Sequence, residues 1–280
     1  MKKRYLLSAA EGIAFKISGG EDGQLLMKAV HTSKKDEYST NYSNPPIPKG
    51  YKHILGTWES GFVIEKNDYF DKSQFVWIPV GFLETNGTLD GKTYDEKFGR
   101  RNYRSAFAFE DKAEPHMYNV KKYGGFYISR YAISKSKDGK PQSVKGQMPW
   151  TNVTRSEAQW IADQFCHDDD VKAHLPFGAE YDSVFEWLFE TRQKSYNAIF
   201  NCSSSWGNYW DSSDAAKKIL PTGSNEKWCA GQIYDLAGNI AEWTQESTCN
   251  EGKPISRGGA AQDSGEEYNA FKRSTEFEAT

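Results

Sequence analysis

The feature that most limits the fold is a long stretch without regular periodicity, between residues 197 and 231. It consists mainly of Ser, Asn, Asp, Gly and Trp. A loop region this long in a compact domain is usually functional or held in place by specific contacts. Aromatic residues make up 15% of a chain that is only 38% hydrophobic. This balance favours a loop-rich globular protein with an aromatic core over a helical bundle.

Regular elements are predicted before this stretch. Short β-rich runs bounded by polar turns occur at residues 62–64, 75–80 and 124–133. A helix is predicted from Thr154 onwards, because Thr154 and Glu157 have the spacing of a capping box and apolar residues then recur on one face. A second helix with an apolar stripe is predicted to begin near residue 177.

The first fifty residues differ in composition from the rest of the chain. Residues 1–50 are polar and end in a Pro-rich stretch at 44–50, which cannot continue a helix or a central strand. They are predicted to form an N-terminal arm or small extension, followed by one domain over residues 51–280. Residues 5–30 fit either a short strand pair or a helix. The arm is either a site of attachment and homo-oligomerisation or an ordinary flexible leader.

Charge and composition exclude several classes of function. The net charge is −3 and basic residues are scattered, so a nucleic-acid partner is not expected. The apolar run after the basic start is too short to insert in a membrane and marginal for a signal peptide, which predicts synthesis in the cytoplasm without a clear export signal. The four cysteines form no CxxC motif and are expected to be reduced thiols. The chain also lacks a Walker loop, a G-x-S-x-G elbow and an H-E-x-x-H motif.

Two motifs near the C-terminus carry the most structural information. Residues 234–243 contain the pattern D-x-x-G-N-x-x-E-W, in which Gly238 and Asn239 favour a tight turn. Residues 256–260 contain R-G-G, where glycine allows close approach of another strand and Arg257 is expected to be a buried structural guanidinium.

Five segments in order resemble the formylglycine-generating-enzyme (sulfatase-modifying-factor) family. They are Gly125–Tyr131, Trp150–Thr154 with Glu157 and Ala158, Leu175–Tyr181, Tyr234–Trp243 and Ser256–Ala260. The resemblance is specific over residues 124–260, loose over 51–123 and absent before residue 50. It implies an α+β, C-type-lectin-type fold with small twisted antiparallel sheets, two helices and long irregular loops.

The resemblance also implies a structural calcium ion near the D-x-x-G-N-x-x-E-W motif. Asn239 and Glu242 would supply hard oxygen ligands, with loop carbonyls completing the shell. The alternative is that Asn239 caps a turn and Glu242 pairs with a backbone N–H or an arginine.

The chain departs from the family where catalysis is expected. Catalytic members carry two cysteines after R-G-G that hold copper and perform the oxidation, and those positions fall on Asp263 and Tyr268. Neither side chain supplies the sulfur that Cu(I) prefers, so no copper and no enzymatic activity are expected. The five histidines are dispersed and do not form a replacement metal cluster.

A non-catalytic chain of this type resembles prophage proteins and the variable proteins of diversity-generating retroelements, which bind ligands. We therefore expect a ligand- or receptor-binding protein, with a protein or carbohydrate partner on a cell or phage surface and a location on a virion or cell surface. Alternatives are an enzyme with altered, non-copper chemistry and a structural phage tail component. Polar and aromatic residues in two segments are the predicted ligand contacts: Trp206, Asn208, Tyr209, Trp210, Asp211, Gln262, Asp263, Glu266, Tyr268, Asn269 and Phe271. One of the two tryptophans is expected to be buried.

Overall fold

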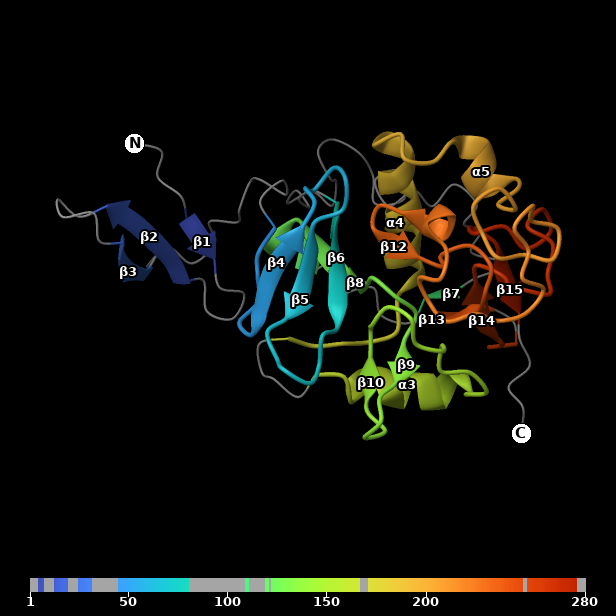
Figure 1. Cartoon of the computed structure of the whole chain (residues 1–280), viewed down its shortest axis with the longest axis horizontal. Coiled ribbons are helices and arrows are strands. Elements are labelled where there is room, and N and C mark those ends of the chain that lie inside the picture. The colour runs from blue at the N-terminus through green and yellow to red at the C-terminus, as the bar shows by residue number, and fades with distance from the viewer. Residues whose placement is uncertain are drawn as a thin grey trace.

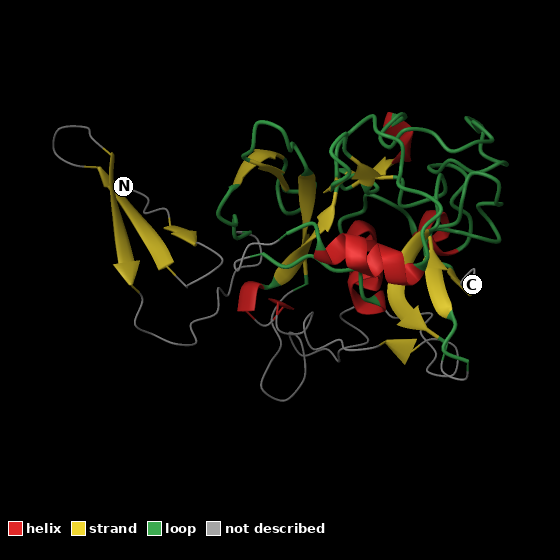
Figure 2. Cartoon of the chain, turned by 90° about the horizontal axis from the view of Figure 1, so that it is seen from below, coloured by secondary structure: helices red, strands yellow, loops and turns green. Residues whose placement is uncertain are grey.

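A computed structural model of the chain describes residues 45–80, 119–120, 122–166, 171–248 and 251–275, together with the backbone of four strands outside these ranges. The architecture is α+β, as predicted, with small antiparallel sheets and few helices (Figures 1 and 2). Three of the four strands form an N-terminal antiparallel sheet, namely β1 (Tyr5–Leu7), β2 (Ile13–Gly19) and β3 (Leu25–His31). Strands rather than a helix therefore occupy this part of the chain.

One four-stranded antiparallel sheet contains the β-rich runs that the sequence indicates. Its strands, in order, are β4 (Tyr51–Leu55), β5 (Val63–Lys66), β6 (Gln74–Pro79) and β8 (Gly125–Ser129). Alternation places Val76 and Ile78 in the core, opposite Ile128 and Phe126 on β8. The Pro-rich stretch is attached to this sheet, because the Tyr127 hydroxyl donates to the carbonyl oxygen of Pro46 at 2.8 Å.

A second four-stranded antiparallel sheet contains the two C-terminal motifs. Its strands, in order, are β15 (Arg273–Thr275), β14 (Pro254–Arg257), β13 (Glu242–Ser247) and β7 (Phe109–Glu110). Two further strand pairs are β9 (Ser134–Lys135) with β10 (Pro141–Gln142), and β11 (Cys229–Ala230) with β12 (Ile233–Tyr234). The R-G-G strand β14 is therefore paired on both edges, by β13 and by β15.

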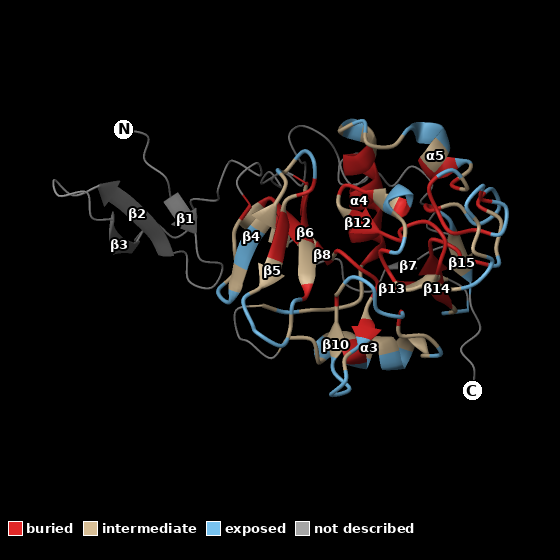
Figure 3. Ribbon diagram, viewed as in Figure 1, coloured by how far each residue is buried: buried red, intermediate tan, exposed pale blue. Residues whose placement is uncertain are grey.

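Both predicted helices are present. Helix α3 (Arg155–Asp163) begins with the capping box, since the Thr154 hydroxyl accepts from the Glu157 N–H and the Glu157 carboxylate accepts from the Thr154 N–H at 2.7 Å. Helix α4 (Gly178–Glu190) is buried almost all round and occupies the centre of the core (Figure 3). Its burial includes polar side chains such as Asp182 and Glu186, which a simple apolar stripe does not predict.

The stretch between residues 197 and 231 is mostly irregular, as expected, but it is not entirely so. It overlaps a short helix, α5 (Tyr196–Phe200), and contains a 3-10 turn, η1 (Glu226–Trp228). The prediction of two helices therefore missed α5, which is too short to show periodicity. The Ser195 hydroxyl caps α5 by accepting from the Ala198 N–H. The loops that follow lie beside β14 and β15, at the end of the domain away from β4 (Figure 1).

Candidate functional site

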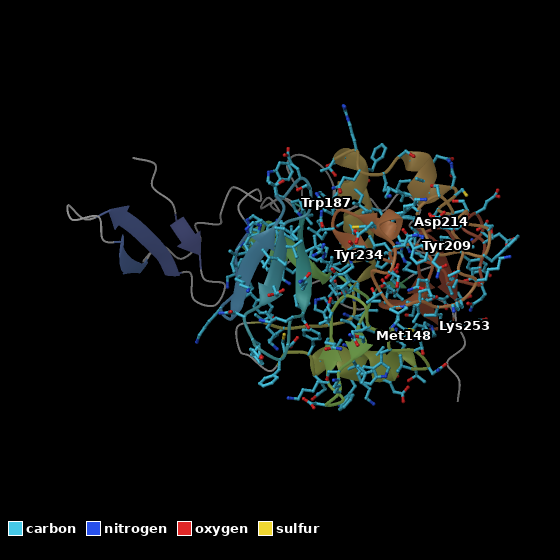
Figure 4. All side chains as sticks on the ribbon, in the orientation of Figure 1. Met148, Trp187, Tyr209, Asp214, Tyr234 and Lys253 are labelled. Atoms are coloured by element: carbon cyan, nitrogen blue, oxygen red, sulfur yellow. The ribbon has the colours of Figure 1, made fainter. Side chains whose placement is uncertain are left out.

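Buried aromatic side chains hold the long loop in place. Trp206 is 3% exposed, and its indole N–H donates to the Ala198 carbonyl at 2.9 Å. Tyr209 is fully buried, and its hydroxyl donates to the Gly258 carbonyl of the R-G-G turn at 2.6 Å. Tyr209 lies inside the loop-rich part of the chain in Figure 4. The loop is therefore anchored at one end to α5 and at the other to the end of β14.

A pair of buried asparagines joins this loop to the D-x-x-G-N-x-x-E-W turn. Asn208 Nδ2 donates to Asn239 Oδ1 at 3.0 Å, and both side chains are fully buried. The Asn239 oxygen also accepts from the Leu220 N–H at 2.9 Å, and its amide group donates to the Leu220 carbonyl at 3.1 Å. Asn239 has φ 65, which asparagine tolerates better than most residues. The two amides therefore connect three loop segments.

Asp211 fastens the long loop to the segment after R-G-G. Its Oδ1 accepts from the Ser204 hydroxyl at 2.8 Å and from the Gly265 N–H at 3.1 Å, and its Oδ2 accepts from the Ser264 hydroxyl at 3.0 Å. Desolvation raises the pKa of Asp211, but these hydrogen bonds outweigh it and the net pKa lies below the ordinary value. Gly265 permits this contact, since a Cβ there would lie 2.5 Å from the Ser204 nitrogen.

Two further predicted contact residues close local turns. The Asp263 carboxylate accepts from the Ala260 N–H at 2.8 Å. Asn269 donates to the Phe200 carbonyl at 3.2 Å and accepts from the Phe271 N–H at 3.2 Å. Both residues are half-buried, and their polar groups are occupied largely by the protein itself. Asp263 and Asn269 therefore stabilise the conformation of the segment after R-G-G instead of presenting free polar groups to a ligand.

Five predicted contact residues are exposed, and one of them, Asp211, has its carboxylate occupied by the hydrogen bonds described above. We call the other four the loop surface: Trp210, Gln262, Glu266 and Tyr268. Trp210 is 54% exposed and Tyr268 is 37% exposed. The backbone N–H of Trp210 donates to the Asp263 carbonyl at 3.1 Å, so the backbone of the long loop is joined to the segment that carries the other three. Exposed aromatic rings on an ordered backbone lose little conformational entropy when they bind.

Four other predicted contacts are wrong in this structure, because their side chains are buried. Trp206, Asn208, Tyr209 and Phe271 are at most 3% exposed, and cannot touch a ligand at the surface. The expectation that one of the two tryptophans is buried is confirmed, since Trp206 is buried and Trp210 is exposed. Phe271 packs against Phe185 and Phe200 with ring centroids 5.7 and 4.7 Å apart. These buried aromatic and amide side chains therefore anchor the polar loops instead of contacting a ligand.

The oxygen atoms near the predicted calcium site differ from the expected pair. Asn239 does not fit as a ligand, because its amide oxygen already accepts two hydrogen bonds. Asp235 fits better: it is buried, its Oδ2 accepts from Thr222 and Gly223, and its Oδ1 has no hydrogen-bond partner among the residues that the structure describes. A buried unpartnered carboxylate oxygen requires an explanation such as a bound ion.

Glu242 is the second carboxylate in this region. It accepts a hydrogen bond from the Tyr181 hydroxyl at 3.2 Å. Burial, together with the charge of nearby Asp235, raises the pKa of Glu242 to about 7, although the hydrogen bond from Tyr181 acts in the opposite direction. Burial likewise raises the pKa of Asp235. A divalent cation between these carboxylates would relieve both effects. Among the described residues no group of three His, Cys, Asp or Glu side chains gathers, so such an ion would also need backbone carbonyls.

A buried cluster of four charges joins α4 to strands β13, β14 and β15. Arg257 donates to Glu246 at 2.7 Å and to Asp182 at 2.9 Å, and Arg273 donates to the same two carboxylates at 2.6 and 2.7 Å. The prediction that Arg257 is a buried structural guanidinium is confirmed. Sequence reasoning missed the other three members of the cluster, because they come from α4, β13 and β15 and no local pattern joins them.

The described cysteines Cys166, Cys202 and Cys229 are partly exposed and form no disulfide, whereas Cys249 lies outside the described residues. Within the described part of the chain, no helix is long and apolar enough to cross a membrane.

Comparison of the chain with protein-family models, curated proteins and solved structures gives no significant match. Function must therefore be inferred from the residues and their geometry.

Proposed function

We propose that this chain is a non-catalytic binding protein with a C-type-lectin-type fold, which presents the loop surface to a protein or carbohydrate partner on a cell or phage surface. The single observation that carries the proposal is the position of Trp210. Its ring is 54% exposed, although its neighbours Trp206 and Tyr209 are buried anchors. A large aromatic side chain held exposed on a fixed backbone is a recurrent feature of binding hot spots and of sugar-stacking sites.

The segment after R-G-G supports binding rather than oxidation. The positions at which the resemblance expects copper-binding cysteines hold Asp263 and Tyr268, and Asp263 closes a turn on Ala260. Tyr268 contributes an exposed ring to the loop surface. Tyr and Trp beside Gln and Glu side chains combine apolar area with hydrogen-bonding groups, as adaptable binding surfaces do. By the same resemblance, prophage or retroelement-diversified variable proteins are the class to which we assign the chain.

Replacement of Trp210 should abolish binding without unfolding the protein. Labelled wild-type chain would be applied to an array of bacterial surface glycans and surface proteins, alongside Trp210→Ala. We expect the variant to lose at least tenfold in affinity, since truncation of a hot-spot aromatic costs about 2 kcal/mol or more. Trp160→Ala is the matched control, because Trp160 is 62% exposed on α3, outside the loop surface. Equal losses in both variants, or none in Trp210→Ala, would contradict the proposal.

The non-catalytic part of the proposal has a separate test. The protein would be incubated with copper and a cysteine-bearing sulfatase peptide, and the peptide mass would be followed. We expect no conversion of cysteine to formylglycine. Formation of formylglycine above the level in a protein-free control would show that the chain is an enzyme.

We also propose a structural calcium ion held in part by Asp235 and Glu242. Calcium at about 100 times its dissociation constant should stabilise the folded state by about 3 kcal/mol, which raises the melting temperature of a domain of this size by about 5 °C or more. The ion would neutralise buried carboxylates and hold the loops, and no step of ligand binding is assigned to it. Differential scanning fluorimetry with calcium and with a chelator measures the shift.

Two variants make the calcium experiment specific. Asp235→Ala should remove the response to calcium, whereas Asp214→Ala should keep it, because Asp214 is an exposed carboxylate that pairs with Lys227 at 2.8 Å. If wild type shows no shift, or if Asp235→Ala responds as wild type does, calcium does not bind here.

A further inference from the structure

A cavity lies between the β4–β5–β6–β8 sheet and helix α3. Its volume is about 340 Å³, within the size range of small-molecule sites. Its walls come from β4, β6, β8, α3, the Pro-rich stretch and the segment leading to α4. None of the four loop-surface residues lines the cavity, and Figure 1 places strand β4 of this sheet far from strand β15, which follows the loop surface in the sequence. The cavity is thus distinct from the loop surface, and its role is independent of the function proposed above.

Aromatic rings form the main wall of the cavity. Tyr51, Phe75 and Phe165 stack edge to face, with centroids 5.9 Å apart for Tyr51 and Phe75 and 5.3 Å apart for Phe75 and Phe165. These rings are only partly buried, although Phe75 lies on a strand of the core sheet. Trp150 also lines the cavity and is partly buried. Aromatic faces that remain accessible within a cavity favour flat apolar ligands.

The Pro-rich stretch completes this wall instead of acting as a free linker. Pro46 and Pro48 line the cavity. The Tyr127 hydroxyl holds Pro46 through its carbonyl at 2.8 Å, and the Tyr51 N–H donates to the Pro48 carbonyl at 3.1 Å. Proline rings have no backbone N–H to satisfy, so they can line an apolar surface without leaving a donor unpaired. The Pro-rich stretch therefore has a structural role in this cavity, separate from the loop surface.

Polar atoms are few, and the buried carboxylate among them is compensated within the wall, whereas the other charged lining residue, Lys172, is exposed. Glu180 is 3% exposed, and its carboxylate accepts from the Phe177 N–H at 2.9 Å and lies 3.5 Å from His174 Nε2. His174 Nδ1 lies 2.7 Å from the Leu175 carbonyl. The Cys166 thiol lies 3.7 Å from the Tyr51 hydroxyl. Because an unpaired charge is costly in an apolar site, this lining suits an uncharged ligand with a single polar group.

From these features we infer that the cavity between the β4–β5–β6–β8 sheet and α3 binds a small, uncharged, planar aromatic molecule. The ligand stacks among the Tyr51, Phe75 and Trp150 rings. Its polar group faces the end of the cavity that carries the Cys166 thiol and the Tyr51 hydroxyl. The recognition is apolar and shape-based, which differs from the polar and exposed character of the loop surface.

Two probes that differ in one charged group test this directly. N-phenyl-1-naphthylamine is neutral and becomes fluorescent in apolar sites, and 1-anilinonaphthalene-8-sulfonate is its sulfonated analogue. Wild-type protein should bind the neutral probe saturably, at least tenfold more tightly than the anionic one. Equal or tighter binding of the anionic probe, or no saturable binding of the neutral probe, would overturn the inference.

A filling variant locates the probe. Ala162 lines the cavity from α3, so Ala162→Trp should weaken binding of the neutral probe at least tenfold. Trp160→Ala, on the exposed side of the same helix, should bind within twofold of wild type. Unchanged binding in Ala162→Trp would place the probe elsewhere and refute the site.

A measurement on wild-type protein keeps the inference testable even if the filling variant unfolds. The neutral probe should slow alkylation of Cys166 by iodoacetamide at least fivefold, as measured by peptide mass spectrometry. The rates at Cys202 and Cys229, which do not line the cavity, serve as internal references and should stay constant. Protection of all three thiols alike, or of none, would contradict binding at this site.

Discussion

Replacement of Arg257 by alanine should destabilise the protein by about 3–5 kcal/mol, the cost of removing one partner from a buried ion pair. Arg257 is fully buried, and its guanidinium donates to Glu246, to Asp182 and to the Phe271 carbonyl at 3.0 Å. Without it, both buried carboxylates lose an arginine partner, and the Phe271 carbonyl loses the donor that Arg257 supplies. Urea unfolding followed by circular dichroism measures the loss.

An exposed ion pair provides the matched control. Lys227 pairs with Asp214 at 2.8 Å, but its side chain is 69% exposed. Lys227→Ala should therefore cost less than about 1 kcal/mol, because water screens the pair and hydrates the remaining charge. Similar losses in Arg257→Ala and Lys227→Ala would mean that the cluster of four charges is solvated in solution.

The same cluster should give stability a characteristic dependence on pH. Desolvation opposes ionisation of Glu246, but Arg257 and Arg273 outweigh it and lower its pKa to about 2. A carboxyl group with a lowered pKa stabilises the folded state above its ordinary value of 4.5, and this contribution is lost as the pH falls from 4.5 towards 2. Wild-type protein should lose about 3 kcal/mol over this interval from Glu246. Glu246→Gln carries no titrating group at this position. The free energy of unfolding of this variant should therefore lack the part of the decrease between pH 4.5 and 2 that Glu246 causes.

Local chemistry made some of this structure predictable from the sequence. The capping box at Thr154 fixes where α3 begins, because both of its hydrogen bonds lie within four consecutive residues. The β-rich run at 75–80 became β6 for a similar reason, since alternation and turn residues act over short distances. The burial of Arg257 was also foreseeable, since it immediately precedes two glycines that pass close to other backbone.

The candidate site was harder to predict, because long-range contacts decide which loop residues are exposed. In the sequence, Asn208 looks like a surface residue of a polar loop. Its side-chain amide is buried, however, and donates a hydrogen bond to Asn239, which lies in a turn distant in sequence. Asp211 likewise resembles a ligand contact, yet three donors from two loops occupy its carboxylate. The apolar cavity beside α3 could not be anticipated at all, because its walls come from segments separated by more than a hundred residues.

Trp206 and Trp210 lie four residues apart in the same polar loop, yet the first is buried and the second is exposed. Trp206→Ala should cost about 3–5 kcal/mol of stability, as truncation of a buried aromatic residue does. Its ring is 3% exposed, its indole donates to Ala198, and Lys194 Nζ lies 4.6 Å from its centroid. Trp210→Ala should change stability by less than about 0.5 kcal/mol, because exposed side chains make few contacts. Circular dichroism in urea compares the two without relying on tryptophan fluorescence.

The paired variants also separate anchoring from recognition. Trp206→Phe keeps an aromatic ring but removes the hydrogen bond to Ala198, so it should recover more than half of the stability lost in Trp206→Ala. If Trp206 acts by fixing the loop, Trp206→Phe should also bind the array ligands nearly as wild type does, while Trp210→Ala remains folded and does not bind. A stable Trp206→Ala variant would mean that Asn208, Tyr209 and Asp211 hold the loop without the buried indole. The exposed position of Trp210 would then depend on the hydrogen bonds between the two loops rather than on the buried indole.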